Sequence, residues 1–442
     1  MRARRFDVCI VGSGFAGTFL GLRLAERGID TMIVEAGGDV PPEAPPEGDR
    51  HLLPHREVGD GAFPVEFNRT IGIGGTSRRW NGVISRFVPG DFESRTRYDL
   101  FADWPIRYSD LEAHYAEAER ALESQPGSVL SCAAGERAPS LPGAEGMSLA
   151  AVPMSSRTPG GGPIRLREVE IPRFLASGHG TLLARRPAIR LRSDTAGTVA
   201  AVEVRAPGGV QLVEADRYVV AAGVVETVRL LLSSTSTRHP RGLGNDHDLL
   251  GRFVHSHPRP RLHVPRDPLR SGMSGLYRSL GAAEEFRNRG LAAVCVDYNF
   301  FEADPAVDLT LEMEPAWENC VRLDPEARDA WGRPLAVVDC HATDIDRATR
   351  AEAERLQSEL ARALLVGGEV RTGEPKWFHP AGGCRMGEGP ERGVVDGDGR
   401  VFGTRNLFVA GTSVFPTSGA TNPTLTVVAL ALRLADHLTG SC

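Results

Sequence analysis

Two residues near the end of the chain, His379 and Asn422, have the chemistry needed to oxidise an alcohol. His379 lies in the Gly- and Pro-rich run 378–387, FHPAGGCRMG, and Asn422 lies in the run 418–426, SGATNPTLT. An alcohol carbon releases hydride readily only as its hydroxyl loses a proton, and a neutral imidazole can accept that proton at neutral pH. A side-chain amide can donate to the developing alkoxide oxygen and hold it in place. The sequence therefore predicts His379 as a general base and Asn422 as the group that orients the hydroxyl.

Asn422 also fits a second role, because it directly precedes Pro423. Proline is favoured in the first turn of a helix, and asparagine is a favoured N-cap residue. A helix that begins at Pro423 and Thr424 would direct its positive end at a bound cofactor. The sequence leaves open whether the Asn422 side chain caps this helix or faces the substrate.

The start of the chain carries a nucleotide-binding pattern. An apolar strand from Val8 to Val11 leads into the run 12–17, GSGFAG, and a helical pattern follows it. A second strand, Thr31 to Val34, ends on Glu35. This order predicts a dinucleotide site, with the glycines close to a pyrophosphate and Glu35 bonded to a ribose. The motif alone does not distinguish a nicotinamide from a flavin.

Three further segments contain glycines in positions that suit a bound nucleotide. The run 72–82, GIGGTSRRWNG, offers bare backbone amides and small hydroxyls that suit a diphosphate or a flavin ring. Apolar strands also break on glycine at Tyr218–Ala222 and Leu407–Ala410. Together these segments predict the following cofactor-binding residues: Gly12, Ser13, Gly14, Gly17, Glu35, Gly74, Gly75, Thr76, Ser77, Asn81, Gly82, Gly223, Gly411, Pro423 and Thr424.

The composition excludes several classes of protein. The chain has 442 residues, is 41% hydrophobic and 24% charged, and carries a formal charge of −6, which indicates neither disorder nor a nucleic-acid partner. Its seven cysteines form no CxxC pair, and no apolar run reaches the ~20 residues of a membrane span. With a strand beginning at Phe6 we expect no export signal, no membrane partner and a cytoplasmic location. His255 and His257 could suggest a metal pair, but a structural role is the simpler interpretation because no third ligand lies nearby. We expect no metal site.

The order of predicted elements indicates an α/β protein built of two domains. Strand-glycine-helix patterns occur at both ends of the chain, whereas strand-like runs at 291–301, 307–313 and 335–341 suggest an antiparallel sheet. A helix is expected from Leu111 to Leu122, capped by Ser109 or Asp110, and another from about 346 to 365. We predict a discontinuous Rossmann-like FAD-binding domain over 1–90, 165–255 and 378–442. An inserted substrate-binding domain would take 91–164 and 256–377.

These motifs together resemble the glucose–methanol–choline (GMC) family of FAD-dependent oxidoreductases. The matching segments are 12–17 with Glu35, 74–77 with 81–82, 103–106, 221–232, 250–253 and the two C-terminal runs. The C-terminal spellings are similar to those of pyranose oxidases, bacterial sugar and polyol dehydrogenases and cholesterol oxidases. The resemblance implies FAD as the cofactor, His379 as the active-site histidine and Asn422 as its partner. Family members with covalent flavin use a histidine where this chain has Arg79, which implies non-covalent FAD.

The resemblance implies oxidation of an alcohol to a carbonyl, with hydride passing to flavin N5. A sugar, polyol, glycoside or specialised-metabolite alcohol is the expected small-molecule substrate. Oxygen, a quinone and a carrier protein all remain open as electron acceptors. A lyase of the same fold without net redox, a nicotinamide-dependent dehydrogenase and a non-catalytic FAD-binding protein are the alternatives.

Overall fold

The computed structural model describes residues 5–39, 53–60, 68–125, 149–155, 163–265, 276–279, 281–300, 305–364, 369–373 and 376–440. Much of the Pro- and Gly-rich stretch 124–163 and of the loop 37–54 lies outside the described residues.

A parallel sheet of five strands forms the nucleotide-binding part of the molecule. Its order is β21-β11-β1-β2-β7, with all neighbours parallel. The strands are β1 Phe6–Val11, β2 Thr31–Val34, β7 Gly180–Leu183, β11 Ala215–Val220 and β21 Leu407–Val409. Most of their residues are apolar and buried, as expected for strands covered on both faces. Segments from both ends of the chain thus share one sheet, and the predicted Rossmann-like fold is confirmed.

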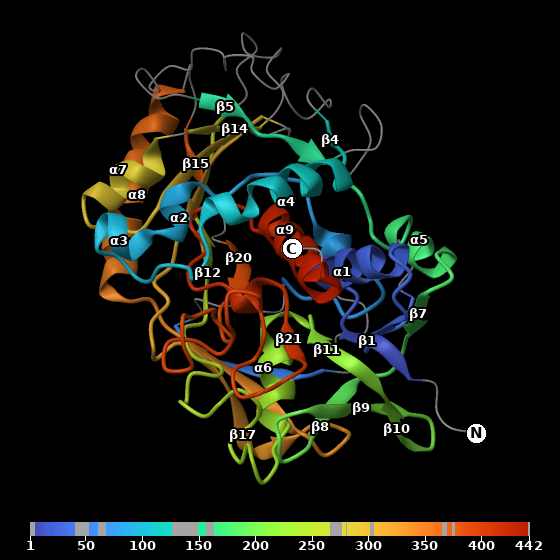
Figure 1. Ribbon diagram of the computed structural model, residues 1–442. Coiled ribbons are helices and arrows are strands. Elements are labelled where there is room, and N and C mark those ends of the chain that lie inside the picture. The colour runs from blue at the N-terminus through green and yellow to red at the C-terminus, as the bar shows by residue number, and fades with distance from the viewer. Residues whose placement is uncertain are drawn as a thin grey trace.

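Helices from distant parts of the sequence pack beside this sheet. The first helix, α1 Phe15–Glu26, contacts the C-terminal helix α9 Thr424–Thr439, and α4 Tyr108–Ala121 packs against α9 as well. Figure 1 shows α9 next to α1 near the middle of the molecule. All three contribute buried residues to the larger hydrophobic core.

A second, antiparallel sheet has a smaller core of its own. Its order is β19-β13-β16-β15-β14-β5. The strands are β5 Leu149–Ala151, β13 Arg261–His263, β14 Leu276–Ser279, β15 Val294–Asn299, β16 Ala306–Leu311 and β19 Arg371–Thr372. The helices α7 Ala282–Asn288 and α8 Asp344–Ala363 pack against it. In Figure 1 this unit lies at the upper left, away from β1, β11 and β21.

Two other groups of strands connect to the larger core. Strands β8 Ala188–Ser193, β9 Val199–Ala206 and β10 Gly209–Val213 form a three-stranded antiparallel sheet with the expected hairpin at residues 207–208. Strands β17 Cys320–Arg328 and β18 Pro334–Cys340 pair with each other, and β18 runs parallel to β3 His55–Gly59. We expected the run 335–341 in the inserted antiparallel sheet. It packs instead on α6 Gly223–Ser233 because its alternate residues Ala336, Val338 and Cys340 complete the larger core. The division into domains stays a prediction.

One more pair of strands connects the two parts beside His379. Strand β12 His255–Arg259 pairs antiparallel with β20 Lys376–Ala381, which contains His379. The remaining elements are short: α2 Pro89–Phe92, α3 Ser94–Tyr98, α5 Glu170–Ala176, β4 Ser124–Gln125, β6 Met154–Ser155 and the 3-10 turns η3 Gly75–Arg79 and η5 Thr412–Val414.

The predicted cap of the helix at 111–122 was wrong. The helix begins at Tyr108 with Arg107 as its N-cap residue, and Asp110 acts from the third position by accepting the backbone N–H of Arg107 at 2.7 Å. An acidic side chain in the first turn serves the same orphan amides and the helix dipole from inside the helix.

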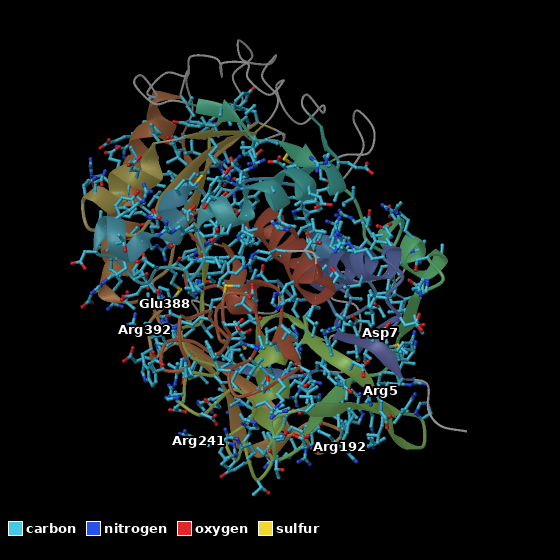
Figure 2. All side chains as sticks on the ribbon, viewed as in Figure 1. Arg5, Asp7, Arg192, Arg241, Glu388 and Arg392 are labelled. Atoms are coloured by element: carbon cyan, nitrogen blue, oxygen red, sulfur yellow. The ribbon has the colours of Figure 1, made fainter. Side chains whose placement is uncertain are left out.

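Charged side chains cover the outside of the molecule. Figure 2 shows Arg5, Asp7, Arg192, Arg241, Glu388 and Arg392 extending from its periphery. Arg392 and Glu388 form an exposed ion pair at 3.3 Å, of a kind that adds little to stability. Among the described residues, none of the helices has the length and apolar character needed to span a bilayer.

Candidate active site

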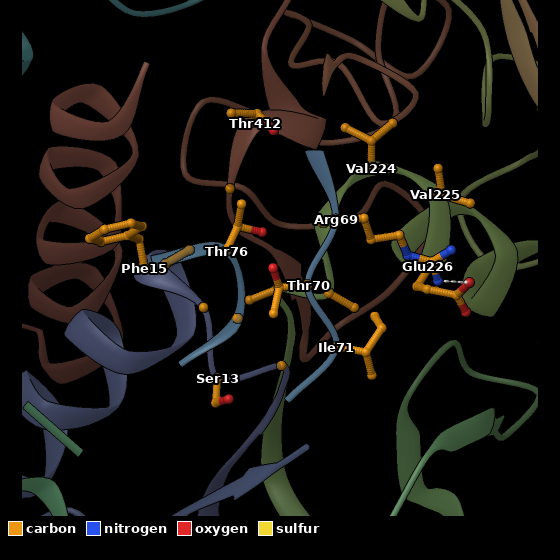
Figure 3. Close-up of a pocket in the computed structure, with 18 of the residues that line it drawn as sticks. Ser13, Phe15, Arg69, Thr70, Ile71, Thr76, Val224, Val225, Glu226 and Thr412 are labelled. Carbon is orange, nitrogen blue, oxygen red and sulfur yellow. Dashed lines mark hydrogen bonds and ion pairs between the residues drawn. The ribbon is translucent and has the colours of Figure 1, made fainter. Parts of the chain in front are cut away.

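A cavity opens where three parallel strands end and three helices begin. Its lining includes residues that follow β1, β11 and β21 and residues at the starts of α1, α6 and α9. The carboxyl edge of a parallel sheet is the usual ligand site in such folds. Figure 3 shows Ser13, Phe15, Thr76 and Thr412 around this space, with Arg69 and Glu226 on one side.

The glycines around the cavity fit a bound dinucleotide. A Cβ on Gly14 or Gly223 would meet no atom within 4 Å, and on Gly411 it would approach only the Ala16 side chain, at 3.9 Å. These positions leave open space that a methyl group would fill. By contrast, a Cβ on Gly12 would lie 2.4 Å from the Ala221 carbonyl oxygen, and one on Gly17 would lie 2.0 Å from that of Gly12. Gly12 and Gly17 therefore let strand and helix pack closely behind the cavity, as the fingerprint requires.

Glu35 is held rigidly at the end of β2. Its carboxylate accepts the Ser13 backbone N–H at 3.0 Å, the Ser13 hydroxyl at 2.7 Å and the Gly37 N–H at 3.0 Å. Burial raises the pKa of this carboxyl group, and these hydrogen bonds oppose the rise. The carboxylate is positioned at the cavity wall, where it could accept ribose hydroxyls.

The structure brings most of the predicted cofactor residues together. The following line the cavity: Gly12, Ser13, Gly14, Glu35, Gly75, Thr76, Gly223, Gly411, Pro423 and Thr424. The others lie outside its lining: Gly17, Gly74, Ser77, Asn81 and Gly82. Gly74 supports the site from behind, since its N–H donates to the Ser13 hydroxyl at 3.1 Å. Asn81 is exposed, and Gly82 accepts the backbone N–H of Ser155 at 2.7 Å.

Sequence reasoning missed a buried ion pair in the cavity wall. Arg69 donates to Glu226 at 2.6 Å, and both residues line the cavity. Glu226 stands in the first turn of α6, directly after a strand-glycine break, which is a position where a polar residue faces a ligand. No pattern in the sequence around Arg69 indicates this role.

His379 lies at the edge of the same cavity, on β20. It has a φ of 60°, a left-handed conformation that is strained for a residue with a side chain. Gly382 and Gly383 follow it, and their amides donate to the carbonyls of Thr412 and Arg252. These bonds fix the loop that positions the imidazole.

His257 contacts the His379 imidazole directly. The two Nδ1 atoms are 2.9 Å apart, and the Nε2 of His257 is 2.9 Å from the Ser418 hydroxyl. The sequence predicted only a structural role for His257 and did not reveal this contact with His379. The pairing of β12 with β20 places His257 opposite Phe378 and so next to His379, and the i, i+2 spacing of His255 and His257 was the only signal for it in the sequence.

Asn422 does not cap a helix. Helix α9 begins at Thr424 with Pro423 as its N-cap residue, and no side chain makes a capping bond there. The Oδ1 of Asn422 instead accepts from Arg278 at 3.1 Å, while its Nδ2 lies 3.4 Å from the Nε2 of His379. Arg278 is held in turn by a double hydrogen bond to Asp297, at 2.7 and 2.9 Å.

These contacts assign the protons of the histidine pair. Arg278 can only donate, so the Asn422 oxygen faces Arg278 and the amide N–H faces His379. The His379 Nε2 must then be the unprotonated acceptor, and its proton resides on Nδ1, where it is donated to the Nδ1 of His257. The remaining proton of His257, on Nε2, is donated to Ser418. His379 thus presents a lone pair on the same nitrogen that Asn422 approaches.

The surroundings keep the buried histidines neutral. Burial lowers the pKa of His379 well below its usual range, and the nearby His257, Arg259 and Arg278 lower it further. Burial also lowers the pKa of His257 to about 3 and that of His255 to about 4. An unprotonated base is the state that alcohol oxidation needs. Among the described residues, no cluster of three or more His, Cys, Asp or Glu side chains could hold a metal ion.

Two parts of the chain match known protein families, and several known proteins resemble it over nearly its whole length. The C-terminal part, residues 315–431, matches the profile described as GMC oxidoreductase, and residues 5–42 match an FAD binding domain. The 2-methyl-1,2-propanediol dehydrogenase of Mycolicibacterium austroafricanum is 27% identical, with 99% of this chain and 95% of that protein covered. The 6'''-hydroxyparomomycin C oxidase of Streptomyces lividus is 28% identical, with 98% and 92% covered.

Solved structures agree on the fold. A formate oxidase from Aspergillus oryzae has a TM-score of 0.68 at 18% identity, covering 100% of this chain and 99% of its own. The expected cofactor, FAD, and the α/β architecture are confirmed. The chain carries the C-terminal profile of glucose–methanol–choline (GMC) oxidoreductases together with an FAD-binding profile, and it is an FAD-dependent oxidoreductase that acts on alcohol groups.

Proposed function

We propose that this enzyme oxidises a CH–OH group with His379 as the general base and Asn422 as the group that orients the hydroxyl. The observation that supports this most strongly is that a proton acceptor and a hydrogen-bond donor lie next to each other. The Nε2 lone pair of His379 and the N–H of Asn422 approach within 3.4 Å at the edge of the cofactor cavity. A hydroxyl that lies beside this pair and replaces their long direct contact could donate its proton to His379 while its oxygen accepts from Asn422.

Bound FAD supplies the acceptor for the hydride that leaves the alcohol carbon. The residues that fit it are the open glycines Gly14, Gly223 and Gly411, the ribose acceptor Glu35 and the start of α9. The protein contributes the proton acceptor at His379 Nε2, the hydrogen bond from Asn422 and the exclusion of water by burial. General base catalysis of this kind is typically worth ~10²–10⁴-fold.

We infer that the substrate is a small polyol, sugar or glycoside alcohol. The relatives named for a diol and for an aminoglycoside support this class. The antiparallel sheet next to Asn422 supports it as well, because its polar side chain Arg278 binds Asn422. The electron acceptor stays open among oxygen, a quinone and a carrier protein.

Anaerobic flavin bleaching tests the assignment. The purified yellow protein is mixed with a panel of polyols and sugars, and the rate of flavin reduction is measured for the wild type, His379→Ala and Asn422→Ala. We expect His379→Ala to slow reduction at least ~100-fold. Loss of one hydrogen-bond donor to a developing oxyanion typically slows a reaction ~10²–10³-fold, and we expect flavin reduction in Asn422→Ala to slow by a factor of that size. Near-normal reduction in His379→Ala would refute the role of His379, and a wild type that no alcohol bleaches would refute the function.

A further inference from the structure

A row of charged side chains crosses the antiparallel sheet next to the active site. The strand register places Arg278 opposite Asp297, Asp297 opposite Asp308, and Asp308 opposite Arg261. Arg261 donates twice to Asp308, at 2.6 and 2.8 Å, just as Arg278 does to Asp297. Each carboxylate therefore has its own arginine. The row starts at the catalytic pair, because Arg278 also holds the Asn422 oxygen.

A third arginine, Arg259, has no carboxylate of its own. Its Nη2 is 3.7 Å from Asp297 and 3.6 Å from Asp308, beyond hydrogen-bond distance for both. Within the described part of the chain the Arg259 side chain makes no hydrogen bond, and its Nε is buried without a partner. The guanidinium also lies over the ring of Phe378, 5.5 Å from the ring centroid. Among the described side chains of this cluster, three arginines stand against two carboxylates, an excess of one positive charge.

Two further buried carboxylates, Asp91 and Glu312, are bound to a different arginine. Asp91 and Glu312 both bind Arg287, at 2.8 and 2.9 Å, and Glu312 also accepts the Gly419 N–H at 2.9 Å. Lys376, the residue opposite Arg259 on β20, adds a further positive charge at the exposed end of that strand.

Arg259 is placed to meet a substrate that occupies the catalytic pair. His257 and Arg259 stand two residues apart on β12, so their side chains emerge on one face about 7 Å apart along the strand. His257 touches His379, and the Arg259 charge is close enough to lower the pKa of both histidines. The side chain is 16% exposed, so it is not sealed inside the protein.

We propose that Arg259 is a specificity-determining residue that binds a carboxylate on the alcohol substrate, several bonds from the carbon that is oxidised. This inference rests on the proposed function, which puts the reacting hydroxyl beside His379 and Asn422. A guanidinium with unused N–H donors matches the two oxygens of a carboxylate. One surplus positive charge is balanced by one carboxylate, whereas a phosphate monoester with roughly −1.5 to −2 charges would overcompensate it. An ammonium group in the same position, next to Arg259, would be repelled. The preferred substrate class is then a hydroxy acid of the sugar-acid type.

Matched substrates test the proposal with the holoenzyme. D-gluconate and D-glucitol share a six-carbon polyol chain and differ only in a terminal carboxylate or hydroxymethyl group, and D-glucamine has an ammonium group there. Glycerate and glycerol form a shorter matched pair. We expect the wild type to reduce its flavin most efficiently with the carboxylate member of at least one pair, and least efficiently with glucamine.

Arg259→Gln should lower kcat/KM for the preferred acid by roughly 10- to 100-fold, the range for a lost charge-assisted hydrogen bond, and leave the neutral partner within about threefold. Arg259→Lys keeps the charge and should recover part of the preference. Lys376→Gln removes a neighbouring positive charge without changing Arg259, so it should keep the preference. A wild type that favours the neutral member of both pairs, or equal losses for acid and neutral substrates in Arg259→Gln, would overturn the proposal.

Binding separates this inference from the catalytic assignment. Calorimetric titration of the preferred acid into His379→Ala holoenzyme should show binding, and the His379→Ala, Arg259→Gln double variant should bind it roughly 10- to 100-fold more weakly. If His379→Ala reduces flavin normally but Arg259→Gln still abolishes the preference for the acid, the proposed base is wrong and the role of Arg259 stands. Equal affinity of the single and double variants would refute the role of Arg259 whatever the role of His379.

Discussion

Replacing His257 by Phe should slow flavin reduction although His257 touches neither the cofactor cavity nor the reacting Nε2. His257 accepts the Nδ1 proton of His379 across 2.9 Å and so keeps the opposite nitrogen free to act as a base. Phe fills a similar volume but accepts no hydrogen bond. A buried donor left without a partner costs about 1–3 kcal/mol, which disfavours the reactive tautomer by roughly 5- to 150-fold. We therefore expect a fall of about 10- to 100-fold in the rate of flavin reduction by a saturating alcohol.

His257→Gln distinguishes tautomer control from packing. The Gln carbonyl can accept the same proton, so this variant should recover most of the lost rate. His255→Phe is the matched control, because His255 is buried on the same strand but donates its Nδ1–H to the Phe253 carbonyl rather than contacting His379. It should stay within about threefold of the wild type. Anaerobic stopped-flow traces and pH profiles of the three variants check this. Reduction by His257→Phe within threefold of the wild type, or equal slowing in His257→Phe and His257→Gln, would refute the reasoning.

Three further predictions address the fold, the cofactor and the amide. The pKa values of His255, His257 and His379 are lowered on folding, so the unfolded chain binds more protons than the folded chain below pH 6.5. The free energy of unfolding should therefore fall by up to about 1.4 kcal/mol per histidine from pH 6.5 to 5.5. Urea unfolding at pH 7.5, 6.5 and 5.5 measures this, and a midpoint that does not change with pH contradicts it. Gly14→Val places a branched side chain in open space at the cavity and should yield protein with little bound FAD. Gly208→Val, also in open space but outside the cavity lining, is the control and should stay yellow. Equal FAD content in the two purified variants would contradict the binding of FAD in this cavity. Asp297→Asn leaves Arg278 buried with a weakened partner, so Asn422 should be held less firmly. Flavin reduction should then be slower in stopped-flow kinetics, while the FAD content measured by absorbance stays normal. An unchanged rate would mean that Arg278 orients Asn422 without help from Asp297.

The nucleotide-binding half of the fold could be predicted from local patterns. Continuous apolar strands that end on glycine, as at Val11 and Val409, identify the parallel sheet without any knowledge of tertiary contacts. The cavity lining follows from the same rule, because the carboxyl ends of such strands meet at one edge. Gly17 and Gly74 lie outside the lining because a glycine can serve close backbone packing as well as a ligand.

The residues that could not be predicted depend on pairings between distant segments. Strand β18 joins β3 and the larger core through contacts made across more than 270 residues, which no periodicity reveals. His257 becomes the partner of His379 only through the pairing of β12 with β20, and Arg278 reaches Asn422 from β14. A polar residue shows its type in the sequence, but its partner is set by the tertiary fold.

The choice between the two roles of Asn422 shows how tertiary contacts override a local preference. In isolation the pair Asn422-Pro423 favours a capping asparagine, which is typically worth about 1 kcal/mol to a helix. The observed side chain gives up that bond and accepts from Arg278, a charged donor whose hydrogen bonds are worth about 1.5–3 kcal/mol. The stronger bond also fixes which end of the amide faces His379, and that orientation requires an unprotonated Nε2. The buried Arg278–Asp297 pair thus orients the amide, and the amide and His257 set the histidine tautomer. Burial, with a smaller contribution from the positive surroundings, lowers the pKa of that histidine and keeps it neutral.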